Sequence, residues 1–221
     1  MSTNIHAEQK PLIYQIGKHV KLVDDATFCK SIIADGKELI TGEEYGAIRV
    51  LELKDEKVYI TFKEDLTSLA NAFSGCSALK SIPENLFANC PKATDFSFTF
   101  FGCKALTAIP EGLFANNPKV TIFQGTFSYC SALKSLPANL FANNRKVNSF
   151  RLTFSGCSAL KSIPENLFAN CPKVNSSFQT FALCKSLKSI PTGLFAHNPE
   201  VTDFSGTFSG CSALESISEK L

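Results

Sequence analysis

Apolar residues recur along most of this chain at one fixed interval. The clearest copy of the pattern runs from Phe154 to Thr180, with the core Phe-x-x-Cys-x-x-Leu-x-x-Ile/Leu. The same core occurs six times, and its cysteines are evenly spaced, twenty-seven positions apart, at Cys76, Cys103, Cys130, Cys157, Cys184 and Cys211. A fixed period between about 20 and 50 residues is typical of repeat architectures, in which neighbouring copies stack to bury a continuous core.

Within each copy the pattern predicts a strand, a helix, a second strand and a half-turn. Leu-x-x-Ile suggests a short extended segment, and the Pro-x-x-Leu-Phe that follows suggests a short helix, since proline is tolerated in a first helical turn. Val-x-x-Phe suggests a second extended segment, and Thr-Phe-x-x-Cys suggests one helical turn. We therefore predict an α/β solenoid over residues 66–221, with short parallel strands and short helices, made of five full repeats from Phe73 and a partial sixth. The sixth copy has Ser218 where the others have proline, and its polar end suits a terminal cover.

The residues before the repeats follow a strand-like pattern instead. Residues 1–10 are polar and predict a flexible tail, whereas 11–65 predict antiparallel β structure. A hairpin is expected about Asp35 and Gly36, and a second one about the charged segment 54–57. This segment either caps the open end of the repeats or anchors the chain in a larger assembly. The absence of a Gly/Ser-rich or Pro-rich linker favours direct docking on the repeats.

Composition and charge exclude several classes of function. The net charge is +2, from 22 basic and 20 acidic residues, so no overall field points to nucleic acid. No apolar run is long enough to span a bilayer. Nine cysteines are present, but without metal-ligand spacing, and their place in repeat columns predicts packing rather than a disulfide framework or a metal site. With three histidines and no catalytic or cofactor-binding motif, we expect neither enzyme activity nor a cofactor.

The segments AFSGCSALKSIP, TFSGCSAL and VTDFSGTFSGCSAL resemble the BspA-like branch of the leucine-rich repeats. The resemblance covers about residues 66–221 and implies a right-handed solenoid used in adhesion and protein–protein contact, often on bacterial surfaces. It implies a secreted or cell-surface protein, whereas residues 1–20 lack the pattern of a secretory signal, so the localisation stays open.

A binding surface is expected where the copies differ, near the second extended segment. Large apolar, aromatic and Arg side chains are typical of interfaces. Such residues, or Gln, break the small-polar pattern at Phe98, Phe101, Ile122, Gln124, Tyr129, Arg151, Leu152, Phe178, Gln179 and Leu183. Packing adjustment or neutral drift would leave the same variation, and Phe178 beside Ser177 could repair the register.

Two columns of lysines form a second feature. Stacked copies would place them about 5 Å apart, as in neighbouring strands. The columns are Lys80, Lys134, Lys161 and Lys188, and Lys92, Lys119, Lys146 and Lys173. Each is either a solvated polar face or a basic stripe for an anionic glycan or acidic protein. The sequence thus leaves two functions open: a non-enzymatic binding or adhesion module for a protein or glycan, or a structural component of a virion, appendage or oligomer.

Overall fold

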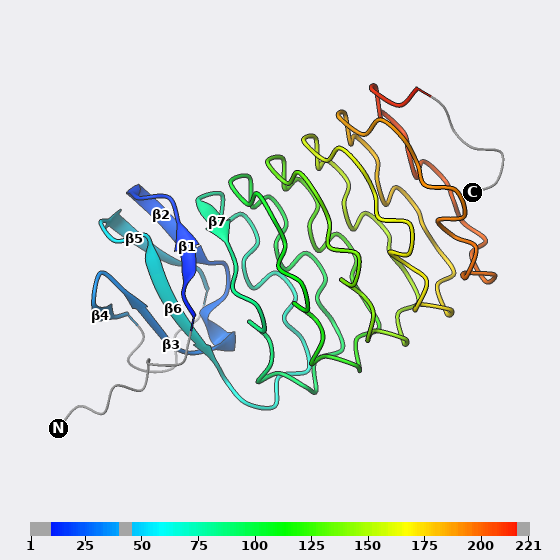
Figure 1. Cartoon of the computed structure of the whole chain (residues 1–221). Helices are drawn as coiled ribbons and strands as arrows, with labels where there is room; N and C mark the ends of the chain where they lie inside the picture. The colour runs from blue at the N-terminus through cyan, green and yellow to red at the C-terminus, as the bar shows by residue number, and fades with distance from the viewer. Residues whose placement is uncertain (1–9, 40–45, 216–221) are drawn as a thin grey trace.

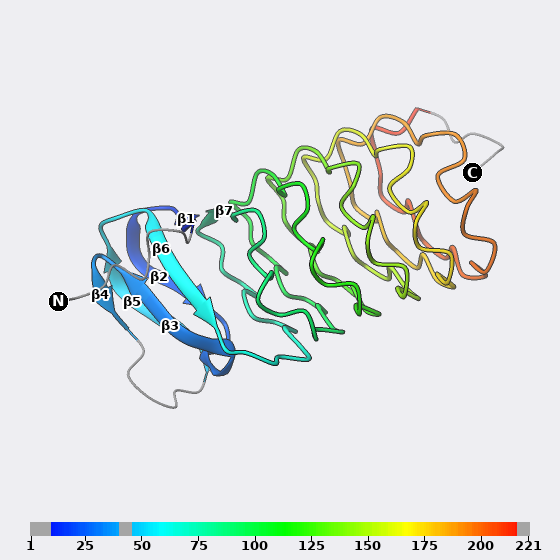
Figure 2. The same ribbon diagram turned by 60° about the horizontal axis from the view of Figure 1, so that its bottom comes forward.

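The computed structural model describes residues 10–39 and 46–215. Figures 1 and 2 show strands β1 to β6 gathered at one end of an elongated molecule, followed by turns of chain lying side by side up to the C-terminal end. The predicted tail, apart from residue 10, lies outside the described residues, as do Ser218 and the rest of the last copy beyond residue 215.

The N-terminal part holds two antiparallel sheets. Strands β1 (Leu12–Tyr14), β3 (Cys29–Ala34), β4 (Lys37–Glu38), β6 (Lys57–Phe62) and β7 (Leu79–Ser81) form the first, in the order β4-β3-β6-β1-β7. Strands β2 (Gly17–Val23) and β5 (Ile48–Leu53) form the second. A 3-10 turn, η1 (Ala26–Phe28), joins β2 to β3. Residues of β1, β2, β3, β5, β6 and β7 are buried in one core that continues into the repeats, whereas both residues of β4 are exposed.

One predicted hairpin is confirmed and the other is wrong. Strands β3 and β4 pair across Asp35 and Gly36, whose φ angles of 50° and 71° suit the left-handed turn that a two-residue hairpin needs. Strands β5 and β6 were expected to pair about residues 54–57, but β5 pairs with β2, and β6 pairs with β1 and β3. The Asp35 carboxylate accepts hydrogen bonds from the backbone N–H groups of Lys54 and Asp55, and so holds this connection as a bend between two sheets.

The N-terminal sheets contact the first repeat directly. Strand β7, in the first copy, pairs with β1, and the Phe62 ring meets the Phe73 ring edge-on with centroids 6.2 Å apart. The Lys21 ammonium of β2 pairs with Asp24 and donates to the carbonyl of Ser74. Strands β1 and β2 therefore cover the open side of the first copy.

Each copy is one turn of chain, and a ladder of backbone hydrogen bonds joins it to the next. Alternate N–H groups donate to carbonyls of the following copy, as in Phe98 to Gln124 and Phe100 to Thr126, both 2.8 Å. The intervening N–H groups close tight turns onto carbonyls three residues back. Isolated parallel bridges mark the same register at Ser68, Asp95, Ile122, Ser149, Ser176 and Asp203.

Columns of identical side chains fill the core between these turns. The rings of Phe100, Phe127 and Phe154 stack nearly parallel, with centroids 5.4 and 5.8 Å apart. Such aromatic pairs add about 0.5–1.5 kcal/mol each beyond the apolar area that they bury. Threonine hydroxyls and cysteine thiols in neighbouring columns reach carbonyls of the preceding copy, for example Cys130 Sγ to Phe100 O at 3.2 Å. The interpretation of the cysteine columns as packing is confirmed, since all nine cysteines are free and buried.

The predicted α/β solenoid of short helices and short parallel strands, and with it the leucine-rich-repeat solenoid implied by the resemblance, is wrong. Among the described residues the regular strands belong to antiparallel sheets, and η1 is the one helical element. Each expected helix is instead a series of turns with bonds three residues back, such as Ala115 N–H to Gly112 O. In three copies a left-handed residue, Asn85, Gly112 or Gly193, interrupts right-handed helix two residues after the proline, and in the other copies a single turn is too short to offset the cost of helix nucleation.

The expected parallel strands fail for a related reason. In each copy, left-handed residues such as Phe98 (φ 55°) and Gly102 (φ 67°) lie between the two expected segments, so neither segment can lengthen into a regular strand. Only isolated bridges and single hydrogen bonds then remain where Val-x-x-Phe and Leu-x-x-Ile predicted strands, apart from β7 in the first copy.

Candidate functional site

Two columns of backbone positions with left-handed φ run along the repeats. The first left-handed column consists of Asn71, Phe98, Gly125, Leu152, Gln179 and Gly206, and the second of Gly75, Gly102, Tyr129, Gly156, Leu183 and Gly210. Their φ angles lie between 51° and 75°. Glycine adopts this conformation freely, whereas a residue with a Cβ loses about 1–2 kcal/mol there. Bulky residues nevertheless occupy five of these positions.

Four of the five bulky residues lie over glycines of the next copy. A Cβ added to Gly125 would overlap the Phe98 ring, and one added to Gly156 would lie 2.7 Å from the Tyr129 ring. Leu183 covers Gly210 in the same way, at 2.7 Å, and Gln179 covers Gly206 at 3.0 Å. Each of these four side chains is therefore accommodated because the equivalent position one turn later has no side chain.

Together with a column of small residues, the bulky side chains form what we call the variable groove. Its volume is about 390 Å³. It is lined by Phe98, Phe101, Ser128, Tyr129, Leu152, Ser155, Gln179, Ala182, Leu183 and Ser209. Phe101 occupies the position that is Ser128, Ser155, Ala182 and Ser209 in later copies. The small residues thus leave a channel that the larger side chains border.

Three aromatic rings gather at one end of the variable groove. The Phe101 ring meets the Phe98 ring at 6.0 Å and the Tyr129 ring at 5.6 Å, both nearly edge-on. Tyr129 is 46% exposed and Leu183 is 39% exposed, so both keep apolar surface in contact with solvent. Single exposed apolar residues are ordinary on protein surfaces, but a cluster of them within a hollow is typical of binding sites.

The polar groups of the groove are few and uncharged. No charged side chain lines it. All ten lining residues donate their backbone N–H groups within the molecule, either to the next copy or three residues back. Ser155 is 4% exposed, its carbonyl accepts a hydrogen bond from the Ser128 hydroxyl, and within the described residues its own hydroxyl makes no hydrogen bond. A partner would therefore contact side chains, with Ser155 as a free hydroxyl at the base of the groove.

The variable groove brings together six of the ten residues predicted to form an interface. Phe98, Phe101, Tyr129, Leu152, Gln179 and Leu183 lie in it. Its small residues were missed, although their signal is the column of serines and alanine that Phe101 interrupts. The glycines under the large side chains were also missed, although glycine fills six of the twelve left-handed positions.

The other four predicted residues lie outside the groove. Ile122 is half-buried at a parallel bridge, and Gln124 shares a column with Arg151 and Phe178. The Arg151 guanidinium lies 4.3 Å from the Phe178 ring centroid and 3.6 Å from the Asp203 carboxylate. Phe178 does not replace the missing core ring, because Ser177 stays buried and hydrogen-bonds Thr180. Arg151 and Phe178 therefore contact each other outside the groove and do not line it.

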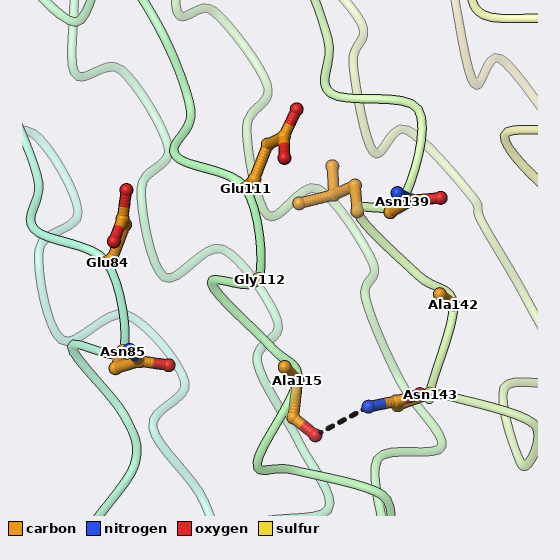
Figure 3. A pocket seen from close by; sticks show the side chains of 9 residues that line it. Glu84, Asn85, Glu111, Gly112, Ala115, Asn139, Ala142 and Asn143 are labelled. Atoms are coloured by element: carbon orange, nitrogen blue, oxygen red, sulfur yellow. Dashed lines mark hydrogen bonds between the residues drawn. The ribbon is translucent and has the colours of Figure 1, made fainter.

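A second hollow, of about 520 Å³, lies over the Pro-x-x-Leu-Phe turns. Figure 3 shows the carboxylates of Glu84 and Glu111 on neighbouring turns, and the Asn143 side chain donating to the Ala115 carbonyl at 3.0 Å. Glycine, alanine and asparagine form most of the remaining lining, with no aromatic ring. In the part of the chain that the structure describes, no three His, Cys, Asp or Glu residues are placed to hold a metal ion. His197, in the asparagine column, is exposed, and among the described residues it belongs to no such group of possible metal ligands.

Comparisons with known proteins do not identify the chain. No family model and no curated protein matches it. A chain in the structure entitled "Structure of the Toll - Spatzle complex, a molecular hub in Drosophila development and innate immunity" is similar over 62% of this chain and 24% of that chain. The identity is 18% and the TM-score is 0.27, values too low to infer a shared fold or function. The expected adhesion role on a bacterial surface gains no support from these matches, and the BspA-like resemblance stays a prediction.

No helix among the described residues has the length and apolar character needed to cross a membrane.

Proposed function

We propose that this chain is a non-enzymatic binding module that holds an uncharged, apolar segment of a partner protein in the variable groove. The observation that carries the proposal is the gathering of Phe98, Tyr129, Leu152, Gln179 and Leu183 in left-handed positions around one groove. Backbone strain of this kind persists only where the surroundings impose it, and it is concentrated at functional sites.

The chemistry of the groove favours side-chain recognition over strand addition. Adding a strand requires free backbone donors and acceptors at an edge, and the N–H groups of the lining residues are already bonded. Clustered aromatic side chains supply most of the binding energy at protein interfaces, and a tyrosine can add a hydrogen bond to its apolar contact. Since no charged residue lines the groove, a charged side chain entering it would lose hydration without gaining a partner.

A neutral glycan is the second candidate. It is favoured by the free Ser155 hydroxyl and the Gln179 amide, which line the same groove as the aromatic rings, because a sugar offers both hydroxyl groups and apolar faces. The two candidates differ in the ligands that the groove would select.

The repeats themselves supply the test variant. Phe101→Ser, Tyr129→Gly and Leu183→Gly together give each position the residue found in most other copies. The two glycines remove left-handed strain, so we expect the variant to unfold at the wild-type urea midpoint or above it. The matched control, Gln124→Ser with Arg151→Ser, makes the same kind of change outside the groove.

The probes are a phage-displayed library of linear peptides and a set of immobilised neutral oligosaccharides. We expect apolar peptides that bind the wild type and the control but not the triple variant. Selective loss of oligosaccharides instead would establish the glycan. Ligands that bind all three proteins equally, or a complete lack of ligands, would refute the groove as a binding site.

A further inference from the structure

A column of charged residues runs along another face of the repeats, at one equivalent position of successive copies. Four consecutive lysines stand between two acidic residues in it, in the order Asp65, Lys92, Lys119, Lys146, Lys173 and Glu200. All six side chains are exposed, whereas the next residue in four copies, Ala93, Val120, Val147 or Val174, is fully buried. The buried neighbour fixes the direction of the backbone, so the lysines of successive turns project from the same face.

The column places like charges close together. Backbone hydrogen bonds join successive copies at about the 4.7–4.9 Å spacing of neighbouring strands, and equivalent core rings of successive copies lie 5.3–6.3 Å apart. Charges at such spacing repel one another unless counter-charges lie between them. Lys92 has one, the Asp65 carboxylate at 2.6 Å. Among the described residues, Lys119, Lys146 and Lys173 form no ion pair with an acid.

Acidic residues close both ends of the column, and an additional base lies at its centre. Asp65 precedes the four lysines and Glu200 follows them in the same register. Arg145 stands where the other copies have proline, next to Lys146, and is exposed. The unpaired positive charge is therefore concentrated over the middle copies of the stack.

Polar side chains accompany the lysines. Two residues after each lysine lie Thr94, Thr121, Asn148 and Asn175, which are half-buried or exposed. Within the described residues, the side-chain amides of Asn148 and Asn175 make no hydrogen bond. The strip thus offers neutral donors beside its charges, as a ligand rich in oxygen atoms requires.

We infer that this strip, Lys119, Arg145, Lys146 and Lys173 with Asn148 and Asn175, binds an anionic polysaccharide that carries one carboxylate or sulfate on each sugar. The acidic groups of such a chain recur along a line, about one sugar length apart, and can meet one lysine per turn. The other lysine column offers less positive charge, because Thr107 interrupts it, Lys80 in it pairs with Glu56, and no arginine adds to it.

Two other polyanions fit the strip less well. Single-stranded nucleic acid is usually held by aromatic side chains that stack on its bases, and no aromatic residue occupies these columns. An extended acidic peptide places side chains of one face about 6.6 Å apart, since a strand rises about 3.3 Å per residue and alternate residues share a face. That spacing loses register with the turns after a few residues.

The test compares two variants that lose the same charge. The first combines Lys119→Gln, Arg145→Gln and Lys146→Gln; the control combines Lys134→Gln, Lys161→Gln and Lys188→Gln in the other lysine column. The probes are dextran sulfate and a polyuronate, with uncharged dextran as the reference, titrated over a series of salt concentrations. We expect the first variant to bind at least about tenfold more weakly, and its slope of log affinity against log salt to fall by about three. The control should retain most of the affinity.

Equal weakening of both variants would show that net charge alone attracts the polymer and would overturn the inference. Failure of the wild type to bind either charged polysaccharide would overturn it as well. Tighter binding of a single-stranded oligonucleotide or of polyglutamate would assign the strip to a different class of partner. The groove variant described above should bind the polysaccharides like the wild type, which separates the two surfaces.

Discussion

Replacing Gly156 by alanine tests whether the ring of Tyr129 is seated on the following copy. The two residues occupy successive positions of the second left-handed column, and the new Cβ would lie 2.7 Å from the ring. The matched control is Gly102→Ala, one copy before Tyr129. Gly102 has a similar φ, 67° against 75°, but the nearest atom to its added Cβ is the Gly75 Cα at 3.8 Å, an ordinary contact.

The two substitutions share one cost and differ in another. Alanine at a left-handed position costs about 1–2 kcal/mol in either case. In Gly156→Ala the ring must also move, and inserting an atom into a packed site typically costs about 1–3 kcal/mol more. We therefore expect a loss of about 1–2 kcal/mol for Gly102→Ala and about 2–5 kcal/mol for Gly156→Ala.

Equilibrium urea denaturation of the full chain measures both losses, provided that the dependence of the unfolding free energy on urea stays constant. Making Gly156→Ala in a Tyr129→Ala background completes a double-mutant cycle. Without the ring, Gly156→Ala should lower the unfolding free energy no more than Gly102→Ala does. Equal losses for the two alanine variants in the wild-type background would refute the seating of the ring, and so would an additive cycle.

Three further predictions concern the core and its polar groups. Thr153→Val should lower the unfolding free energy by about 1 kcal/mol, measured in urea, because the hydroxyl 3.0 Å from the Phe123 carbonyl is lost; Thr153→Ser should keep that contact. Burial raises the pKa of Cys157 to about 12, so at pH 8 the protonated thiol should resist iodoacetamide in the native protein and react in urea, as mass spectrometry can show; modification of the native protein would contradict this. Hydrogen bonds from the Ser205 backbone and side chain lower the pKa of Asp203, so their contribution to stability is present above the unfolded-state pKa and is lost as pH falls through the folded-state value. An NMR titration should place the pKa of that carboxyl below 3.8, and a value at or above this would contradict the hydrogen bonds.

The period and the core columns were readable from the sequence, whereas the local backbone conformation was not. Phe-x-x-Cys-x-x-Leu recurs because these side chains fill equivalent places in successive turns, and a fixed interval expresses that directly. The helix expected at Pro-x-x-Leu-Phe failed because helix and tight turn both accept proline early and leucine later. In three copies a single left-handed residue, such as Gly112, separates the two, and glycine alone does not reveal the sign of its φ angle.

The pairing of β5 was missed for a comparable reason. Two apolar runs about a charged turn favour a hairpin, but the Asp35 carboxylate binds the backbone of Lys54 and Asp55 from another part of the chain. A local pattern does not contain so distant a contact.

The candidate site was located by variation and corrected by geometry. Differences between copies indicated Phe101 and Tyr129, and the structure brings them together. The same differences indicated Arg151 and Phe178, which instead contact each other. Variation shows which positions are free to change, but only the fold shows which of them face one hollow.

The ladder that joins each turn to the next also limits how this molecule can change in length. Backbone donors reach carbonyls of the following copy, parallel bridges recur once per copy, and core thiols reach carbonyls of the preceding one. Inserting or deleting a single residue would shift all of these partners at once. Duplicating or removing one whole copy would keep the backbone ladder and the core columns in register, provided that a glycine still follows each bulky left-handed residue that lies over one. Recombination between copies is therefore the change in length that the backbone of this fold tolerates best, and it would lengthen or shorten the groove and the lysine strip by one turn.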